Sequence, residues 1–128
     1  MNKTVTYTLD QLIFKCCAKL IFAQNREGMA MYRWILHVLQ YEMGRKMDVF
    51  GIEEITLLQK IMNTQQREDY LYLTDILQYE LPKTGGFRSI IEGNKTHYQF
   101  PDYGGRDEVA PEQAKTLTDE QGNRVVSF

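Results

Sequence analysis

Residues 69–81 read Asp-Tyr-Leu-Tyr-Leu-Thr-Asp-Ile-Leu-Gln-Tyr-Glu-Leu, and this stretch decides the fold class that the sequence predicts. At 3.6 residues per turn, its apolar residues fall on two adjacent stripes of one helix. The first stripe consists of Tyr70, Leu73, Leu77 and Leu81, and the second consists of Tyr72, Ile76 and Tyr79. Pro82 follows directly, so the helix is expected to end near Leu81. So wide an apolar surface needs cover from the rest of the chain.

Three further helices are predicted before this one. Thr8 and Gln11 have the spacing of a capping box, which starts the first helix. A second helix is expected at 26–43, and a third begins after Gly51, with glutamates in its first turn. The spacing on this third helix favours as inward residues Ile52, Ile55, Leu58 and Met62, with Leu57 and Ile61 beside them. Short connections make antiparallel neighbours, so residues 1–82 are predicted to form an antiparallel four-helix bundle in a mainly α protein.

The character of the sequence changes after Pro82. Residues 83–128 carry glycine, proline or asparagine turns about every ten residues, which predicts a C-terminal extension of turns and short strands. The segments expected to be regular are 87–91, 97–100, 116–118 and 124–128, the last two as a small hairpin, with one helical turn at 111–115. Residues 1–7 are expected to be an extended lead-in. The aromatic residues of the extension predict that it packs, either on its own bundle or on a partner.

Composition limits the possible functions. The chain has 128 residues, 43% of them hydrophobic and 25% charged, which suits one globular domain. Its formal net charge of −2 gives no general attraction to nucleic acid or to an anionic membrane surface, so neither partner is predicted. The apolar run at 12–23 is interrupted by Lys15 and Lys19, which excludes a membrane span there. Without a signal pattern, a cytoplasmic protein is expected.

The histidines and cysteines do not form a recognisable site. His37 and His97 each lack a histidine or carboxylate three or four residues away, so no metal is expected and both are predicted to be solvated surface residues. Cys16 and Cys17 are adjacent, a separation that rarely suits a disulfide. They fall on the apolar stripe of the first helix, which predicts small core residues rather than reactive thiols.

Two other patterns could indicate a catalytic or processing site. Glu53 and Glu54 are adjacent carboxylates, but neighbours on a helix point about 100° apart and do not share a site. Residues 81–85, Leu-Pro-Lys-Thr-Gly, resemble the sorting signal that sortases cleave, yet the hydrophobic span and basic tail that follow it in that family are absent. We therefore predict no catalytic residue, no cofactor and no enzymatic activity.

The surplus of apolar helix surface points to binding instead. A small bundle buries about one stripe per helix, whereas three of the four predicted helices carry a second one. Phe14 and Phe22 lie at the margin of the first helix and suggest a second contact surface. The residues predicted to form a protein interface are Trp34, Val38, Tyr41, Tyr72, Ile76 and Tyr79. Aromatic-rich exposed faces are typical of interfaces, and a helix-in-groove mode of recognition is expected.

The closing helix resembles a recurrent helix of small bacterial helical-bundle proteins related to the flagellin export chaperones. Its form is Asp-Tyr-apolar-apolar-apolar-x-Asp-apolar-apolar-x-Tyr-Glu-apolar, and the likeness extends over residues 8–82. The resemblance implies an antiparallel bundle that binds an unfolded or helical client, or another copy of itself. The long extension at 83–128 departs from that family.

The sequence thus predicts a non-enzymatic interaction module, export-chaperone-like or an adaptor, that forms a homodimer. Two alternatives stay open. One is a structural or accessory subunit of a larger assembly, of the kind that phages encode. The other is a small enzyme whose site forms between subunits.

Overall fold

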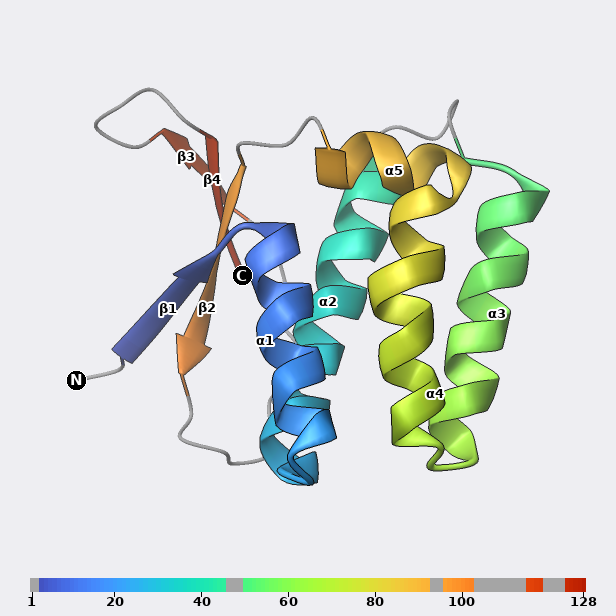
Figure 1. Cartoon of the computed structure of the whole chain (residues 1–128). Helices are drawn as coiled ribbons and strands as arrows, with labels where there is room; N and C mark the ends of the chain where they lie inside the picture. The colour runs from blue at the N-terminus through green and yellow to red at the C-terminus, as the bar shows by residue number, and fades with distance from the viewer. Residues whose placement is uncertain (1–2, 46–49, 93–95, 103–114, 119–123) are drawn as a thin grey trace.

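A computed structural model describes residues 3–45, 50–92, 96–102, 115–118 and 124–128 of the chain (Figure 1). In chain order the elements are β1 (Lys3–Tyr7), α1 (Leu9–Ile21), α2 (Asn25–Arg45), α3 (Ile52–Gln66), α4 (Tyr70–Asp75), the π-helical segment η2 (Ile76–Glu80), the 3₁₀ turn η3 (Leu81–Lys83), α5 (Gly85–Glu92), β2 (His97–Asp102), β3 (Lys115–Thr118) and β4 (Arg124–Ser127). The mainly helical class is confirmed. A four-helix bundle is not, because a fifth helix and a sheet complete the described structure.

The four strands form one sheet in the order β1-β2-β4-β3. β1 pairs antiparallel with β2, so that Val5 lies opposite Phe100, and β2 pairs parallel with β4. β3 and β4 form the predicted antiparallel hairpin, with Thr116 opposite Val126. The predicted extended lead-in is therefore a strand of this sheet. The helical turn expected at 111–115 falls mainly outside the described residues, and Lys115 begins β3.

The elements are arranged so that α1 and α2 lie between the sheet on one side and α3, α4 and α5 on the other (Figure 1). One continuous cluster of buried residues runs through these layers. Its members from beyond Pro82 include Phe87, Ile90, Tyr98, Phe100 and Val126. The described part of the C-terminal extension therefore packs on its own helices and shares their core.

An aromatic stack joins α2 to the sheet. The ring of Trp34 lies 4.8 Å from that of Phe100 at 9°, and Phe100 lies 5.1 Å from Phe128 at 6°. Tyr41 meets Phe128 edge to face at 5.9 Å. Each such pair contributes about 0.5–1.5 kcal/mol beyond the burial of its area. The stack therefore covers Trp34 and contacts Tyr41, two of the α2 residues predicted to form an interface.

The first helix begins as the sequence predicts. The Gln11 backbone N–H donates to the Thr8 hydroxyl oxygen at 3.3 Å, and the Thr8 backbone N–H donates to the side-chain oxygen of Gln11 at 3.0 Å. This capping box satisfies two backbone donors that would otherwise lack partners. Asp10 in the first turn adds a favourable charge at the positive end of the helix dipole.

The closing helix continues further than Pro82 was expected to allow. α4 passes directly into η2 and then η3, so the helical path runs from Tyr70 to Lys83. Pro82 lies in the first turn of η3, where its missing N–H leaves no hydrogen bond unmade. The side chains that the path buries are Leu73, Thr74, Ile76, Leu77 and Leu81.

The predicted inward stripe of α3 is wrong for three of its four residues, and the residues predicted beside it are the buried ones. Ile52, Ile55 and Met62 are exposed, whereas Leu57 and Ile61 are buried. Polar residues complete the inward stripe, because Glu54 and Thr64 are buried with it. The Thr64 hydroxyl donates to the Lys60 carbonyl at 2.8 Å, and Glu54 accepts backbone N–H groups, so both are satisfied. An apolar pattern alone cannot indicate a stripe that is half polar.

Candidate functional site

The structure divides the six residues predicted to form an interface. Trp34, Val38 and Ile76 are buried within the chain, at 6%, 0% and 0% exposure. They are core residues, because all three belong to the buried cluster and the ring of Phe100 covers Trp34. Tyr41 is half-buried beside Phe128. Only two of the six, Tyr72 and Tyr79, are exposed.

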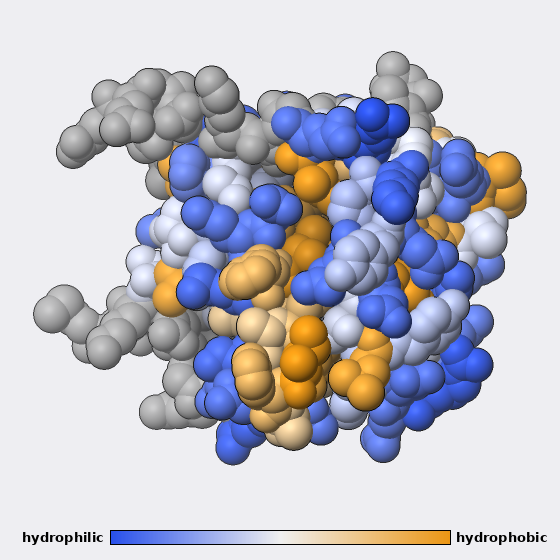
Figure 2. All heavy atoms as spheres, viewed as in Figure 1, coloured by the Kyte–Doolittle hydropathy of each residue, from blue (hydrophilic) through white to orange (hydrophobic). Residues whose placement is uncertain are grey.

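Large apolar side chains remain exposed on the face where α1 and α4 lie side by side. They are Phe14, Ile21 and Phe22 of α1 and its C-terminal cap, Leu71 and Tyr72 of α4, and Tyr79 of η2. We call these six residues the α1/α4 face. In the view of Figures 1 and 2 the two helices are in front; hydrophobic side chains gather over α1, and a smaller hydrophobic spot lies near the lower end of α4.

Contacts between the two helices explain why these side chains share a face. The Cys17 thiol donates to the Thr74 carbonyl oxygen at 3.8 Å, so this side of α1 packs on α4. Phe14 and Ile21 lie three residues before and four residues after Cys17, on the same side of the helix but further from the core. Their exposed fractions of 69% and 50% show that α4 does not cover them.

Two cations lie at the border of this face. Lys15 lies over the Tyr7 ring at 5.9 Å from its centroid. Lys60 of α3 lies 5.4 Å from the Tyr72 ring centroid and pairs with Glu80 at 2.7 Å. Cations over aromatic faces are favourable and orient both partners. The Tyr72 ring is therefore partly positioned by Lys60 of α3.

A shallow hollow of about 510 Å³ adjoins the face beside β1. Its walls are Thr6, Tyr7, Asp10, Gln11, Phe14 and Lys15. Phe14 belongs to both the hollow and the α1/α4 face. The hollow therefore continues the same surface towards the sheet.

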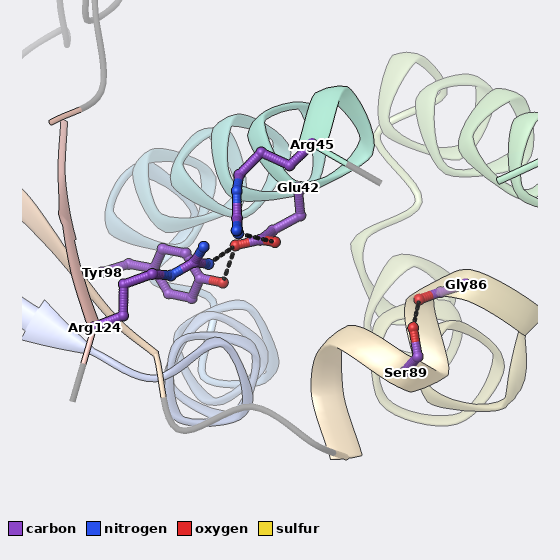
Figure 3. Close-up of polar contacts among 6 residues, drawn as sticks. All are labelled: Glu42, Arg45, Gly86, Ser89, Tyr98 and Arg124. Carbon is purple, nitrogen blue, oxygen red and sulfur yellow. Dashed lines mark hydrogen bonds and ion pairs between the residues drawn. The ribbon is translucent and has the colours of Figure 1, made fainter. Parts of the chain in front are cut away.

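Among the described residues the most deeply buried carboxylate is Glu42 of α2, and both of its oxygens are engaged by groups of the chain itself (Figure 3). Its Oε1 atom accepts a hydrogen bond of 2.9 Å from the Tyr98 hydroxyl and pairs with Arg124. Its Oε2 atom pairs with Arg45 at 3.2 Å. Because both oxygens are engaged, this cluster joins α2 to β2 and β4 and does not offer a general base to a substrate.

A second buried carboxylate, Glu54, joins the starts of α3 and α5. It accepts hydrogen bonds from the backbone N–H groups of Gly51 at 2.8 Å and Gly86 at 2.9 Å. The Gly86 bond, and then the Gly51 bond, hold the pKa of Glu54 below its usual value. The Ser89 hydroxyl donates to the Gly86 carbonyl at 2.8 Å within the first turn of α5 (Figure 3). This arrangement too is internal to the fold.

The cysteines are core residues, as predicted. Both are free and fully buried. Burial raises the pKa of Cys17 to about 12, with the Asp75 charge adding to the effect, and burial also raises the pKa of Cys16. A thiol whose pKa is raised forms little thiolate near neutral pH, so neither sulfur is activated as a nucleophile.

The histidines are less exposed than predicted. His37 and His97 are half-buried, and the Nδ1 atom of each is buried without a hydrogen-bond partner. Burial, and then the nearby Arg33, lower the pKa of His37. Among the residues that the structure describes, no three His, Cys, Asp or Glu side chains come together as metal ligands would.

The pentapeptide 81–85 belongs to regular elements of the fold. Leu81 is fully buried, residues 81–83 form η3, and Gly85 begins α5.

Within the described residues no helix combines the length and the apolar character that a membrane span requires. Comparison of the chain with protein-family models, with curated proteins and with solved structures finds no match.

Sequence reasoning found part of the α1/α4 face. Phe14, Phe22, Tyr72 and Tyr79 are predicted as surplus apolar positions, whereas the sequence assigns no outward role to Ile21 or Leu71. The missing signal was the position of the helix end. α1 ends at Ile21, and the chain reverses at Ala23, whose φ of 60° is left-handed. Ile21 is therefore the last residue of the helix, and its side chain is 50% exposed.

Proposed function

We propose that this protein is a non-enzymatic interaction module that binds another protein surface through the α1/α4 face. The observation that carries the proposal is the exposure of Phe14, Phe22, Leu71 and Tyr79, each at least 60% exposed and all on neighbouring helices. Contiguous apolar patches on soluble proteins mark interaction sites, because leaving such side chains in water forgoes about 1.5–3 kcal/mol each.

The chemistry of the face suits recognition of a helix. α1 and α4 run antiparallel and form a ridged apolar surface onto which an amphipathic helix could lay its own apolar stripe. Aromatic anchors such as Phe14 and Tyr79 would supply most of the binding energy. The resemblance of residues 69–81 to the flagellin export chaperones supports the same role, a chaperone-like or adaptor function towards a helical partner.

We place this function in the cytoplasm. The two cysteines of the chain are both free and buried, which is the state expected in a reducing compartment. Neither cysteine forms a disulfide, the bond that an oxidising compartment would favour.

A second candidate is an accessory subunit of a larger assembly, and a specific observation favours it. Ile52, Ile55 and Met62 form another exposed apolar stripe, on the side of α3 away from the buried Leu57 and Ile61. A protein with two separate apolar surfaces can bridge two neighbours. If this candidate holds, substitutions on α3 would weaken assembly as much as substitutions on α1.

Photo-crosslinking in living cells tests the proposal. A photoreactive phenylalanine analogue replaces Phe14 in one strain and Tyr79 in another, both exposed positions that tolerate a large side chain. The matched control carries the analogue at Arg88, an exposed position on α5 outside the face. We expect discrete protein adducts from positions 14 and 79 and none from position 88. Absence of adducts from both face positions would contradict the proposal.

A further inference from the structure

We propose that the partner of the α1/α4 face is a second copy of this chain, related by a two-fold axis parallel to the helices. The inference rests on the proposed function, since it assumes that this face binds protein. In such a pair, α1 of each copy packs on α4 and η2 of the other. Three properties of the face support this arrangement: its area, the levels of its residues along the helices, and its charges.

The exposed area matches what one partner contributes to a stable interface. The six side chains of the face are on average about 59% exposed. At about 200 Å² for a fully exposed large side chain, they present about 700 Å². A standard interface takes about 800 Å² from each partner. One compact contact between two such faces would therefore be sufficient for specific association.

The two-fold axis places residues of the two copies opposite each other when they lie at the same height along the helices. Rotation about an axis parallel to the helices leaves the height of every residue unchanged, so α1 of one copy meets α4 of the other antiparallel. The Cys17–Thr74 contact fixes the levels of the two helices within one chain. With a rise of 1.5 Å per residue, positions before Cys17 correspond to positions after Thr74.

This correspondence brings apolar side chains together. Ile21 lies four residues beyond Cys17 and Leu71 three residues before Thr74, so Ile21 of one copy lies within about 2 Å of the level of Leu71 of the other. Phe14 and Tyr79 match in the same way towards the other end, within about 3 Å. Each copy supplies both members of each pair, as an isologous interface requires.

The charges at this level are also complementary. Lys15 lies two residues before Cys17 and Asp75 one residue after Thr74, so the two side chains share a level on different helices. Both are exposed. The neighbouring Lys19 is already paired with Glu27 at 3.0 Å. In the proposed dimer, Lys15 of each copy faces Asp75 of the other, which gives two equivalent ion pairs and favours a second copy over an unrelated partner.

A charge exchange tests this directly. Lys15→Glu and Asp75→Lys are each made alone, and molar mass is measured by light scattering after gel filtration at low ionic strength. The wild type is expected to be a dimer with a Kd of about 1 μM or tighter, as interfaces of this size allow. A dimer of either variant alone contains two like-charge pairs, so its dissociation constant is expected to be about tenfold higher than that of the wild type. An equimolar mixture restores both attractive pairs and should form a heterodimer.

The mixture is the decisive arm, because a merely structural effect of either substitution would persist in it. Phe22→Asp gives an independent measurement at the most exposed residue of the face and should yield a monomer, while Ile52→Asp on α3 should leave the dimer intact. A monomeric wild type, or a mixture no more dimeric than its components, would overturn the inference. A monomer that still forms adducts from position 14 with a different protein would overturn the dimer and leave the proposed function standing.

Discussion

The carboxylate of Glu54 accepts a hydrogen bond of 2.9 Å from the backbone N–H of Gly86, 32 residues further along the chain. The same carboxylate accepts from Gly51 at 2.8 Å, so one buried side chain fixes the start of α3 against the start of α5. Both N–H groups belong to helix starts, where no intrahelical partner exists. Glu54 therefore acts as an N-terminal cap for two helices at once.

Replacing Glu54 with alanine should destabilise the fold by about 2–4 kcal/mol, because two backbone donors would lose their partner, one of them buried. The matched control is Glu53→Ala, an exposed neighbour in the same turn, which should change stability by less than about 0.5 kcal/mol. Urea denaturation followed by circular dichroism measures both. Equal effects of the two substitutions would refute the capping role.

The stability that Glu54 provides should depend on pH. Its pKa is lower in the folded state than the ordinary value of 4.5, so its contribution is fully present above that value. The contribution is lost as the pH falls from there through the folded pKa. The free energy of unfolding of the wild type should therefore approach that of Glu54→Gln as the pH is lowered from neutral to about 3. A gap between the two proteins that stays constant over this range would contradict this assignment.

Gly85 should not tolerate a side chain. Its φ is 26°, and a Cβ atom at this position would lie 2.1 Å from Oε1 of Glu54. Moving that oxygen would break its hydrogen bond from the Gly86 N–H, so Gly85→Ala should cost about 1–3 kcal/mol. Gly44→Ala is the control, since nothing lies near the added Cβ, and it should stabilise α2 by up to about 1 kcal/mol. Thermal unfolding of both variants provides the comparison.

The Glu42 cluster should respond unequally to the loss of its members. Glu42→Ala leaves Arg124 and the Tyr98 hydroxyl without their shared acceptor and should cost about 3–5 kcal/mol. Tyr98→Phe removes one donor and leaves both arginines paired with the carboxylate, so about 1–2 kcal/mol is expected. Chemical denaturation separates these values. A larger loss for Tyr98→Phe would mean that the hydroxyl, and not the carboxylate, organises the cluster.

Local signals predicted local structure. The spacing of Thr8 and Gln11 identified the start of α1, and the turn residues 119–123 between two β-branched segments identified the β3–β4 hairpin. Such motifs form from neighbouring residues, so their physics is contained in a short stretch of sequence.

The long-range pairings could not be predicted in the same way. Nothing in residues 3–7 indicates that they pair with residues 98–102, or that Phe100 covers Trp34. The second apolar stripe of α2 was read as an interface because its cover lies more than 60 residues away. On α3 the inward stripe contains Thr64 and Glu54, and Glu54 takes one of its hydrogen bonds from Gly86, 32 residues away. The exposed apolar side chains of α1 and α4 are the part of the predicted surface that the tertiary structure leaves uncovered.

The most direct test of the α1/α4 face is to map where a photoreactive residue at position 14 attaches. The account predicts an adduct of twice the 15.0 kDa chain mass, in which the attached peptide contains residues 70–83 of a second copy. An adduct with another protein at the same position would identify a different partner for the same face. If position 14 gives no more adduct than the control position 88, the claim that this face binds protein is contradicted.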